Sequence, residues 1–338
     1  MQASFNVRVR TGVVLLAVVT ACGSPELPQL CAAHGDSDGR LLVSCFDRYA
    51  DQPYTDAIAF SQVIADTSGL VDRWQYGEAL HFTDFNGDGR TDLCSARGNA
   101  EGHVDVACYN FDDGHFPDAP SFSQTVTALT GWTGDWQYGE ALHFTDFDGD
   151  GRMDLCAARG NAAGELEVLC VLRNADGFAD SLSFEQTLPG KTGLVDRWQY
   201  GEALHFTDFN DDGRVDVCGA FGNAEGSLEV YCFFHERSGS FPDAPSFQQT
   251  FPGTGGWTNR MQYGEPLHFT DFDDNGTMDL CGTHGIEAGH LQVGCFFHQG
   301  DDTLSASRAS FLQILSSTTQ WQGEWRYGEA LHFTWPDR

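Results

Sequence analysis

A unit of 62 to 63 residues occurs five times along this chain, and that regularity restricts the possible folds more than any other feature. Its clearest copy reads YGEALHFTDFDGDGRMDLC from Tyr138 to Cys156. Near copies begin at Tyr76, Tyr200 and Tyr263, and a truncated copy begins at Tyr327. Repetition at a fixed period of this length is typical of propellers, solenoids and arrays, in which each unit buries its apolar face against its neighbours.

Each unit contains four short stretches with the composition of β-strands. In the clearest copy they cover residues 141–145, 154–158, 165–172 and about 183–188. Glycine-rich turns such as 160–164 separate them, and the flanking segments alternate apolar and polar residues, as antiparallel strands do. Four short strands in a unit longer than 40 residues are typical of a propeller blade. We therefore predict an all-β fold, a five-bladed β-propeller of four-stranded blades.

The two ends of the chain support a closed ring. The first unit starts at Leu30, already in its second strand, and the last unit stops after its first strand, at 331–334. The two fragments are complementary, so we expect the C-terminal strand to complete the N-terminal blade. Closure of this kind hides sheet edges that an open array would expose. The predicted propeller domain covers 30–338.

Ten of the eleven cysteines keep the same register as the repeat. They form pairs 14 positions apart, each spanning one predicted hairpin: Cys31/Cys45, Cys94/Cys108, Cys156/Cys170, Cys218/Cys232 and Cys281/Cys295. Zinc sites would need four clustered ligands each, and no Cys-x-x-Cys occurs. In an exported protein, paired cysteines at such spacing favour disulfides. We expect five cross-strand disulfides.

The N-terminus has the pattern of an export signal. Arg8 and Arg10 precede an uncharged apolar run over 11–21, which is too short to span a bilayer as a helix. The run ends in Val-Thr-Ala-Cys22, which resembles the lipobox of bacterial lipoproteins. That resemblance implies a signal peptide at 1–21, a lipidated Cys22, a tether at 22–29, and a location at the outer membrane or cell surface. An ordinary secretory signal is the alternative.

The chain is strongly acidic, with a formal net charge of −31 and a single lysine, Lys191. Such a surface repels nucleic acids and anionic lipids, so we expect no nucleic-acid partner and no membrane contact beyond an N-terminal lipid. The acidic residues are not scattered. Four units place them at positions 1, 3, 5 and 9 of a loop between the first and second strands, with glycine at position 6.

Oxygen-bearing side chains at these positions allow a short loop to curl around one ion, and position 7 would offer its backbone carbonyl. Hard oxygen ligands in a flexible loop suit Ca²⁺ better than Mg²⁺ or a transition metal. EF-hands are not indicated, because the glutamate at position 12 is absent and strands flank the loop. The candidate ligands of four Ca²⁺ sites are Asp84, Asn86, Asp88, Arg90 and Asp92; Asp146, Asp148, Asp150, Arg152 and Asp154; Asp208, Asn210, Asp212, Arg214 and Asp216; and Asp271, Asp273, Asn275, Thr277 and Asp279.

Tyr138-Gly139, the acidic loop and Ala158-Arg159-Gly160 together resemble the FG-GAP/VCBS repeat of integrin α-chain heads and many bacterial surface proteins. The resemblance extends over 30–338. It implies a β-propeller whose loops bind Ca²⁺ on one face. This chain departs from the family in two respects, because the usual blade number is seven and paired cysteines are not a usual feature.

Three other sets of residues recur in the repeat. A histidine in each first strand invites a metal ring, but we expect histidines packed and hydrogen-bonded between blades: His81, His143, His205, His268 and His332. A glutamate begins each of the same strands and should ring one mouth of the axial channel: Glu78, Glu140, Glu202, Glu265 and Glu329. Of the tryptophans before each Tyr-Gly, three are placed for a surface role in stacking on sugars, Trp132, Trp257 and Trp321.

These features favour a monomeric binding or adhesion module for a glycan or protein ligand at the cell surface. Repeated aromatic sites would give multivalent binding. The alternatives are a carbohydrate-active enzyme on a propeller scaffold, either a glycoside hydrolase or a polysaccharide lyase, and a purely structural envelope protein. Glycosidases need non-equivalent carboxylates, whereas the axial acids here are repeated, and no catalytic triad or phosphate loop is apparent. We therefore expect no enzymatic activity.

Overall fold

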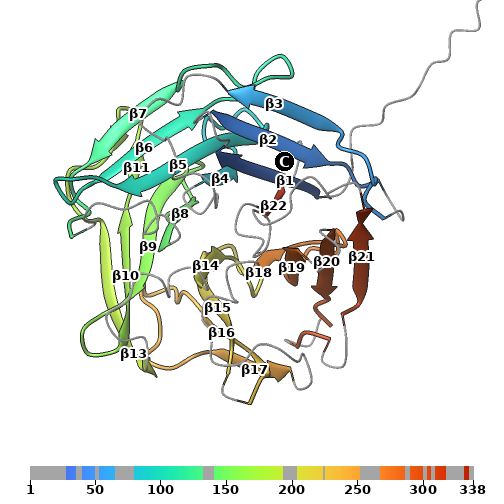
Figure 1. Ribbon diagram of the computed structural model, residues 1–338. Coiled ribbons are helices and arrows are strands. Elements are labelled where there is room, and N and C mark those ends of the chain that lie inside the picture. The colour runs from blue at the N-terminus through green and yellow to red at the C-terminus, as the bar shows by residue number, and fades with distance from the viewer. Residues whose placement is uncertain are drawn as a thin grey trace, which may run out of the picture.

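The computed structural model describes residues 28–35, 40–49, 53–64, 80–131, 141–192, 204–223, 225–251, 267–285, 290–299, 303–305, 309–316 and 331–334. Within these residues the chain is all-β and forms five four-stranded antiparallel sheets arranged around an axis (Figure 1). The predicted five-bladed propeller is confirmed. No helix in the described part of the chain is long and apolar enough to cross a bilayer.

The blades follow one another in chain order, and each has an innermost strand near the axis and an outermost strand at the rim. From inside to outside, blade 1 contains β22 (Leu331–Thr334), β1 (Gln29–Gly35), β2 (Leu41–Phe46) and β3 (Phe60–Ile64). Blade 2 contains β4 (Leu80–Thr83), β5 (Asp92–Gly98), β6 (Val104–Tyr109) and β7 (Phe122–Val126). Blade 3 contains β8 (Leu142–Thr145), β9 (Asp154–Gly160), β10 (Glu165–Val171) and β13 (Phe184–Thr192), with a small ribbon of β11 (Arg173–Asn174) and β12 (Gly177–Phe178).

Blades 4 and 5 repeat the same order. Blade 4 contains β14 (Leu204–Thr207), β15 (Asp216–Gly222), β16 (Leu228–Phe233) and β17 (Phe247–Phe251). Blade 5 contains β18 (Leu267–Thr270), β19 (Asp279–Gly285), β20 (Leu291–Phe296) and β21 (Phe311–Leu315).

The C-terminal strand closes the ring, as predicted. β22 pairs antiparallel with β1, with Gln29 opposite Thr334 and Ala32 opposite Leu331. In Figure 1 the last strand of the chain therefore lies beside the first one in blade 1. β1 begins at Gln29, the last residue of the predicted tether, so blade 1 contains sequence from both ends of the chain.

The hydrophobic core lies between the blades. One cluster combines Val104 and Val106 of β6 with Leu142 of β8 and Leu155 of β9 in the next blade. A cluster of the same kind joins blade 5 to blade 1, where Leu291 and Leu331 pack together. Because each blade covers the apolar face of its neighbour, no single blade has a complete core of its own.

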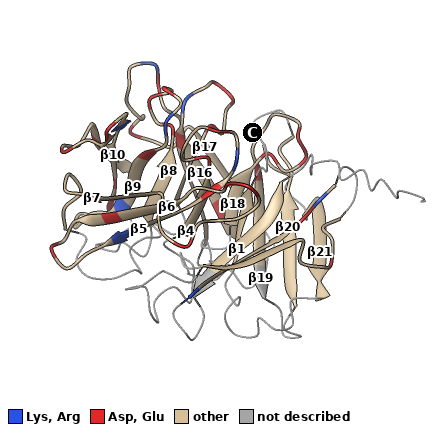
Figure 2. Cartoon of the chain, turned by 90° about the horizontal axis from the view of Figure 1, so that it is seen from above, with Lys and Arg blue, Asp and Glu red and all other residues tan. Residues whose placement is uncertain are grey.

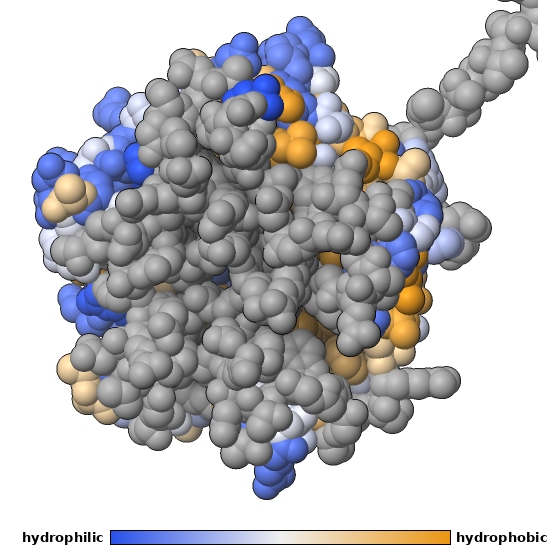
Figure 3. Space-filling view, viewed as in Figure 1, coloured by the Kyte–Doolittle hydropathy of each residue, from blue (hydrophilic) through white to orange (hydrophobic). Residues whose placement is uncertain are grey.

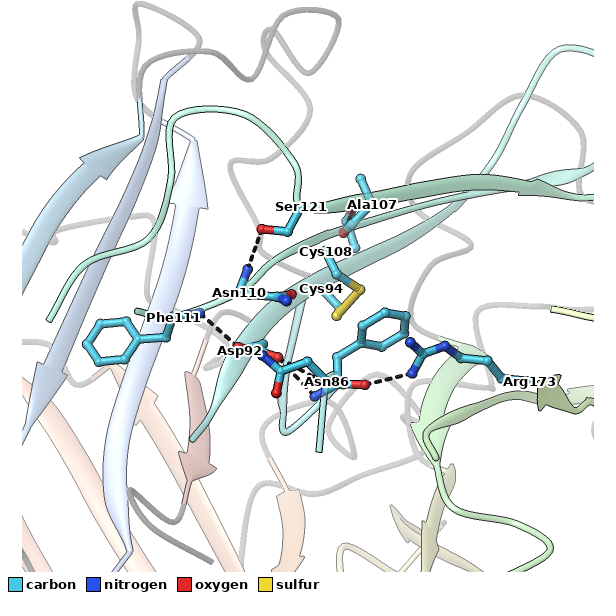
Figure 4. The surroundings of a disulfide bond; sticks show 11 residues. Asn86, Asp92, Cys94, Ala107, Cys108, Asn110, Phe111, Ser121 and Arg173 are labelled. Carbon is cyan, nitrogen blue, oxygen red and sulfur yellow. Dashed lines mark hydrogen bonds between the residues drawn. A yellow bond between two sulfur atoms is a disulfide. The ribbon is translucent and has the colours of Figure 1, made fainter. Parts of the chain in front are cut away.

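The five predicted disulfides are present. Each cysteine of the second strand lies directly opposite its partner in the third strand, with 4.0–4.1 Å between the Cα atoms: Cys31–Cys45, Cys94–Cys108, Cys156–Cys170, Cys218–Cys232 and Cys281–Cys295. Figure 4 shows the pair of blade 2. Each bond closes a 15-residue loop, which the chain-entropy model equates with about 3 kcal/mol of stability.

The antiparallel order gives the propeller two different ends. In blade 2, Thr83 at the end of β4 lies opposite Asp92 at the start of β5, so the acidic loop is at this end, which we call the acidic-loop face. Gly98 at the end of β5 lies opposite Val104 of β6, so the glycine-rich hairpin is at the other end, the hairpin face. Figure 2 shows acidic segments in red on the upper side of the propeller.

Among the described residues, the outer rim has an apolar section at blade 5. Leu312 and Ile314 of β21 are 63% and 51% exposed. In the equivalent places, β7 of blade 2 has Ser123 and Thr125. Figure 3 shows apolar surface on the side of the molecule where β21 lies.

Candidate functional site: the acidic loops and the axial histidines

The aspartate at position 1 organises each acidic loop. In the first loop the carboxylate of Asp84 accepts hydrogen bonds from the backbone N–H groups of Gly87, Asp88 and Gly89, at 2.8, 3.0 and 2.9 Å. In the other three loops the position-1 aspartate accepts from the backbone of positions 5 and 6. The chain therefore curls around the first carboxylate.

This curl requires left-handed backbone at two positions. Gly89 at position 6 has a φ of 84°, and Gly87 at position 4 has a φ of 76°. Glycine adopts such values without steric cost. In the third and fourth loops position 4 is Asp211 and Asp274, which have φ values of 55° and 59°. Aspartate tolerates this region better than most other residues, so all four loops keep the same shape.

The aspartate at position 9 is buried in all four loops. Asp92 accepts from the backbone N–H of Phe85 at 3.1 Å and from that of Phe111, just beyond β6, at 2.8 Å (Figure 4). It thereby ties the loop to the third strand of its own blade. The same pair of bonds occurs at Asp154, Asp216 and Asp279.

Burial raises the pKa of these four carboxyls, because a charge is costly to remove from water. Burial, with a smaller contribution from neighbouring aspartates, raises the pKa to about 6 at Asp92 and Asp154. The same causes raise it to about 7 at Asp216 and Asp279. Backbone hydrogen bonds oppose the shift. A bound cation would favour the ionised form of each carboxyl.

Position 7 contacts position 5 through its side chain. Arg90 pairs with Asp88 at 2.7 Å, Arg152 pairs with Asp150 at 2.5 Å, and Arg214 pairs with Asp212. The hydrogen bond from Arg90 lowers the pKa of Asp88 below its usual value. In the fourth loop the hydroxyl of Thr277 donates to the side-chain oxygen of Asn275 instead. These arginines therefore partly balance the loop charge through side chains, a role that the sequence did not predict.

The donor set fits a hard divalent cation. In the second loop, Asp146, Asp148 and Asp154 offer carboxylate oxygens that all lie within 4.8 Å of one another, and Asp271, Asp273 and Asp279 do the same in the fourth. An ionised carboxylate has about four acceptor sites, so the position-9 aspartates retain capacity beyond their backbone bonds. All side-chain ligands would be oxygens, as Ca²⁺ prefers. Positions 1, 3, 5 and 9 would hold the ion.

A residue from the following blade covers two of the loops. The guanidinium of Arg173 in blade 3 lies 3.8 Å from the ring centre of Phe85 and donates to the Phe85 carbonyl at 2.6 Å. Arg48 in blade 1 does the same to Phe272, at 3.7 and 2.6 Å. Sequence reasoning missed these contacts, although both arginines stand just after the third strand of their blades. They attach an acidic loop of one blade to the next.

The repeated histidines form a closed ring around the axis. Successive imidazole centres are 5.3 to 6.2 Å apart, in the order His81, His143, His205, His268, His332 and back to His81. Each imidazole also contacts the phenylalanine that follows the next histidine of the ring. The expected packing between blades is therefore present.

The surroundings of the ring favour the neutral form of each histidine. Burial lowers the pKa of His205 to about 3 and that of His268 to about 4, and the backbone of the next inner strand opposes the shift by hydrogen bonding. Burial and the neighbouring histidines lower the pKa of His143 and His332 well below the usual value. In these four residues the buried Nε2 atoms have no hydrogen-bond partner. Among the described residues, only the two aspartate clusters bring three potential ligand atoms close enough to hold one metal ion. The histidine ring does not.

Several predicted features lie outside the described residues. These are the signal sequence, Cys22, the five glutamates that begin the inner strands, and the candidate ligand-binding tryptophans Trp132, Trp257 and Trp321. Their roles remain predictions.

Comparison with known families identifies an FG-GAP-like repeat at residues 84–157 and 208–281. Each matched segment starts at position 1 of one acidic loop and runs through the next loop into the following second strand. The match supports the resemblance drawn from the sequence. A search of curated proteins found no match.

Two solved structures resemble this chain at a low level. A candidate 6-phosphogluconolactonase from Bacteroides fragilis NCTC 9343 is 12% identical with a TM-score of 0.40, covering 86% of this chain and 83% of that one. Its counterpart from Bacteroides uniformis ATCC 8492 is 10% identical with a TM-score of 0.39, covering 85% and 82%. At this level of similarity neither structure carries an argument about activity.

Proposed function

We propose that this chain, a five-bladed β-propeller that carries FG-GAP-like repeats, is an exported, calcium-stabilised binding module of the cell surface. The observation that carries the proposal is the repetition of one acidic loop at the same end of four blades. Repetition of one blade suits recognition of an extended or repetitive ligand, because weak contacts at equivalent positions add through multivalency. The proposed ligands are glycans or surface proteins.

Calcium would act on the fold. A cation held by positions 1, 3, 5 and 9 would join the start of a loop, at Asp84 for example, to the second strand at Asp92. It would offset the repulsion between aspartates and the cost of burying the position-9 carboxylate. Ligands that bind only the folded state stabilise it by mass action, so four occupied loops would rigidify the acidic-loop face.

Binding is favoured over catalysis by the equivalence of the blades. Hydrolysis of a glycoside needs two carboxyl groups in different environments, one of which acts as the acid. Among the described residues, the aspartates with the most displaced pKa values occur four times in the same place. Five equivalent histidines are among the described residues that surround the axis.

Export is supported by the covalent structure. Five disulfides within one domain indicate an oxidising compartment, because thiols are kept reduced in the cytosol. The predicted signal sequence and lipobox at Cys22 extend this to a lipid anchor in the bacterial envelope. We propose that the propeller acts as a monomer on that anchor.

Calcium binding is tested by titration calorimetry and thermal unfolding of the domain without Cys22. We expect about four Ca²⁺ per chain and a Tm that falls by more than about 5 °C in excess EGTA. Asp146→Asn combined with Asp148→Asn should remove one site, whereas Asp176→Asn, at an exposed turn of the same blade, should remove none. Four sites retained in the double variant, or a Tm insensitive to EGTA, would refute the assignment.

Ligand binding is tested on an array of bacterial and host glycans with Ca²⁺ and with EGTA. We expect calcium-dependent binding that decreases at least tenfold when Trp132, Trp257 and Trp321 are replaced together by alanine. Replacement of exposed Tyr49 gives a matched aromatic control. If the array is blank while calcium still stabilises the fold, the glycan assignment fails and a protein ligand or a scaffold role takes its place.

A further inference from the structure

The start of blade 1 has no counterpart in the other blades. Elsewhere an acidic loop connects the innermost strand to the second strand, as between Thr83 and Asp92. In blade 1 the innermost strand β22 ends at Thr334, directly opposite Gln29 at the start of β1. These two strands come from opposite ends of the chain. The chain therefore enters the propeller at the acidic-loop face, at the place where a fifth loop would stand.

Contacts hold this entry point against the fold. The carbonyl of Pro28 accepts a hydrogen bond from the hydroxyl of buried Tyr54 at 3.1 Å. The backbone N–H and carbonyl of Tyr54 are bonded in turn to the side chain of Gln313 in blade 5, at 2.7 and 2.8 Å. Pro28 is thus attached to blades 1 and 5 and is not part of a free tail.

Only a short stretch of chain separates this point from the predicted anchor. Cys22 and Pro28 are six residues apart, and six fully extended residues span at most about 20 Å. The seven residues of β1 alone extend about 23 Å, at 3.3 Å per residue, from the acidic-loop face toward the hairpin face. The tether is thus shorter than the path through blade 1 and cannot carry the anchor around to the hairpin face.

We propose that the acidic-loop face is the membrane-proximal surface of this protein and faces the bilayer that holds the lipid on Cys22, with the tether as its attachment. This inference rests on the lipid anchor of the proposed function. The hairpin face is then turned away from the membrane. The segments that bear Trp132, Trp257 and Trp321 each begin after an outermost strand, and the last residues of those strands, such as Val126 opposite Val104, lie at the hairpin face.

Electrostatics defines the kind of bilayer that fits. The acidic-loop face carries three or four aspartates in each of four loops, so an anionic headgroup layer would repel it. A zwitterionic surface such as phosphatidylethanolamine has no such penalty. Repulsion between exposed charges is screened beyond about 10 Å at 0.1 M salt, which is shorter than the maximum span of the tether, about 20 Å, so lipid charge matters only when the face comes closer to the bilayer than the tether requires.

The experiment measures energy transfer from the protein to acceptor dyes on lipid headgroups. The full lipidated chain is purified from bacterial membranes and placed in phosphatidylethanolamine–phosphatidylcholine vesicles. A clickable amino acid carries the donor at one of four exposed sites. Two lie on the acidic-loop face, Asp118 between β6 and β7 and Glu236 between β16 and β17. Two lie on the hairpin face of the same blades, Glu101 and Glu225. All four replacements remove one acidic charge.

We expect transfer from Asp118 and Glu236 to be at least twofold more efficient than transfer from Glu101 and Glu225. Equal or reversed efficiencies in vesicle-bound protein would overturn the orientation while leaving the anchor in place. Cys22→Ala reports on the anchor separately and should abolish co-flotation with vesicles. If the unmodified chain also fails to float, the anchor of the proposed function is wrong and the orientation is overturned with it.

Discussion

At the scale of single residues, the axial histidines show how one repeated side chain shapes the stability of the ring. Five imidazoles with centres 5.3 to 6.2 Å apart can pack while they are neutral. If protonated, each would carry a poorly solvated positive charge beside two like charges. Among the described groups, the electrostatic causes for His143 and His332 are other histidines of the ring, with no carboxylate to offset them.

Acid should therefore destabilise the propeller through this ring. Burial lowers the pKa of His205 from 6.5 to about 3 in the fold, so between these values the unfolded chain binds more protons. The contribution of His205 to stability is complete well above pH 6.5 and decreases as the pH falls below it, by on the order of 2 kcal/mol at pH 5. The raised pKa values of the position-9 aspartates act in the opposite direction, so the contribution of the ring is measured by comparing variants.

Chemical denaturation of the domain between pH 7.5 and 4.5 would measure this effect. His205→Gln should reduce the loss of stability between pH 7 and pH 5. His115→Gln, at an exposed turn, should leave it unchanged. A loss that is the same in both variants would show that the ring does not control acid stability.

At the scale of elements, the blades are joined by a repeated side-chain clamp. One glutamine in each outermost strand bonds both the N–H and the carbonyl of a residue in the next blade. In blade 2, Gln124 accepts from Phe178 at 2.8 Å and donates to it at 2.9 Å. The complete set is Gln62 with Phe116, Gln124 with Phe178, Gln186 with Phe241, Gln249 with Leu304, and Gln313 with Tyr54. The side-chain amide thus acts as a short piece of strand between neighbouring sheets.

Removal of one glutamine clamp should reduce the stability of the domain more than a typical substitution at the protein surface does. Gln124→Ala leaves the backbone groups of Phe178 without their partner, and we expect it to destabilise the domain by about 1–3 kcal/mol. Ser123→Ala, one residue away on the exposed side of β7, should change stability by less than about 0.5 kcal/mol. Urea unfolding of both variants gives the comparison. Equal effects would mean that the clamps contribute little.

At the scale of the whole molecule, closure by β22 makes stability depend on the last residues of the chain. Leu331 belongs to the core between blades 1 and 5, and β22 covers the inner edge of β1. Without this strand, the backbone groups of β1 that face it and the apolar side chains around Leu30 would be exposed to water.

Two truncated chains distinguish the effect of losing β22 on Tm from the effect of shortening the C-terminus. A chain that ends before residue 331 should lose more than about 10 °C in Tm, because a core strand and its ladder are removed. A chain that lacks only 335–338 keeps β22 and should unfold close to the full chain. Calorimetry of both proteins is the measurement. If the longer truncation unfolds at the temperature of the shorter one, closure by β22 is not what stabilises the ring.

Much of the fold could be predicted from the sequence, because the repeat, the cysteine register and the incomplete end units are properties of chain order. Strands that recur with cysteines 14 apart determine hairpins, and complementary fragments at Leu30 and Leu331 determine closure. The acidic loops could also be predicted from the sequence, because their candidate oxygen ligands and glycines lie within nine consecutive residues. Local spacing is sufficient for such features.

Other features depend on contacts between residues that are far apart in the sequence, so only the tertiary structure decided them. The clamp of Gln124 on Phe178 and the stacking of Arg173 on Phe85 cross from blade to blade. The burial that raises the pKa of Asp216, and the side of the propeller on which Pro28 enters, follow from the packing and register of strands. A repeat determines the shape of one blade. The rotation between blades determines which side chains meet, and no spacing within a single unit contains that information.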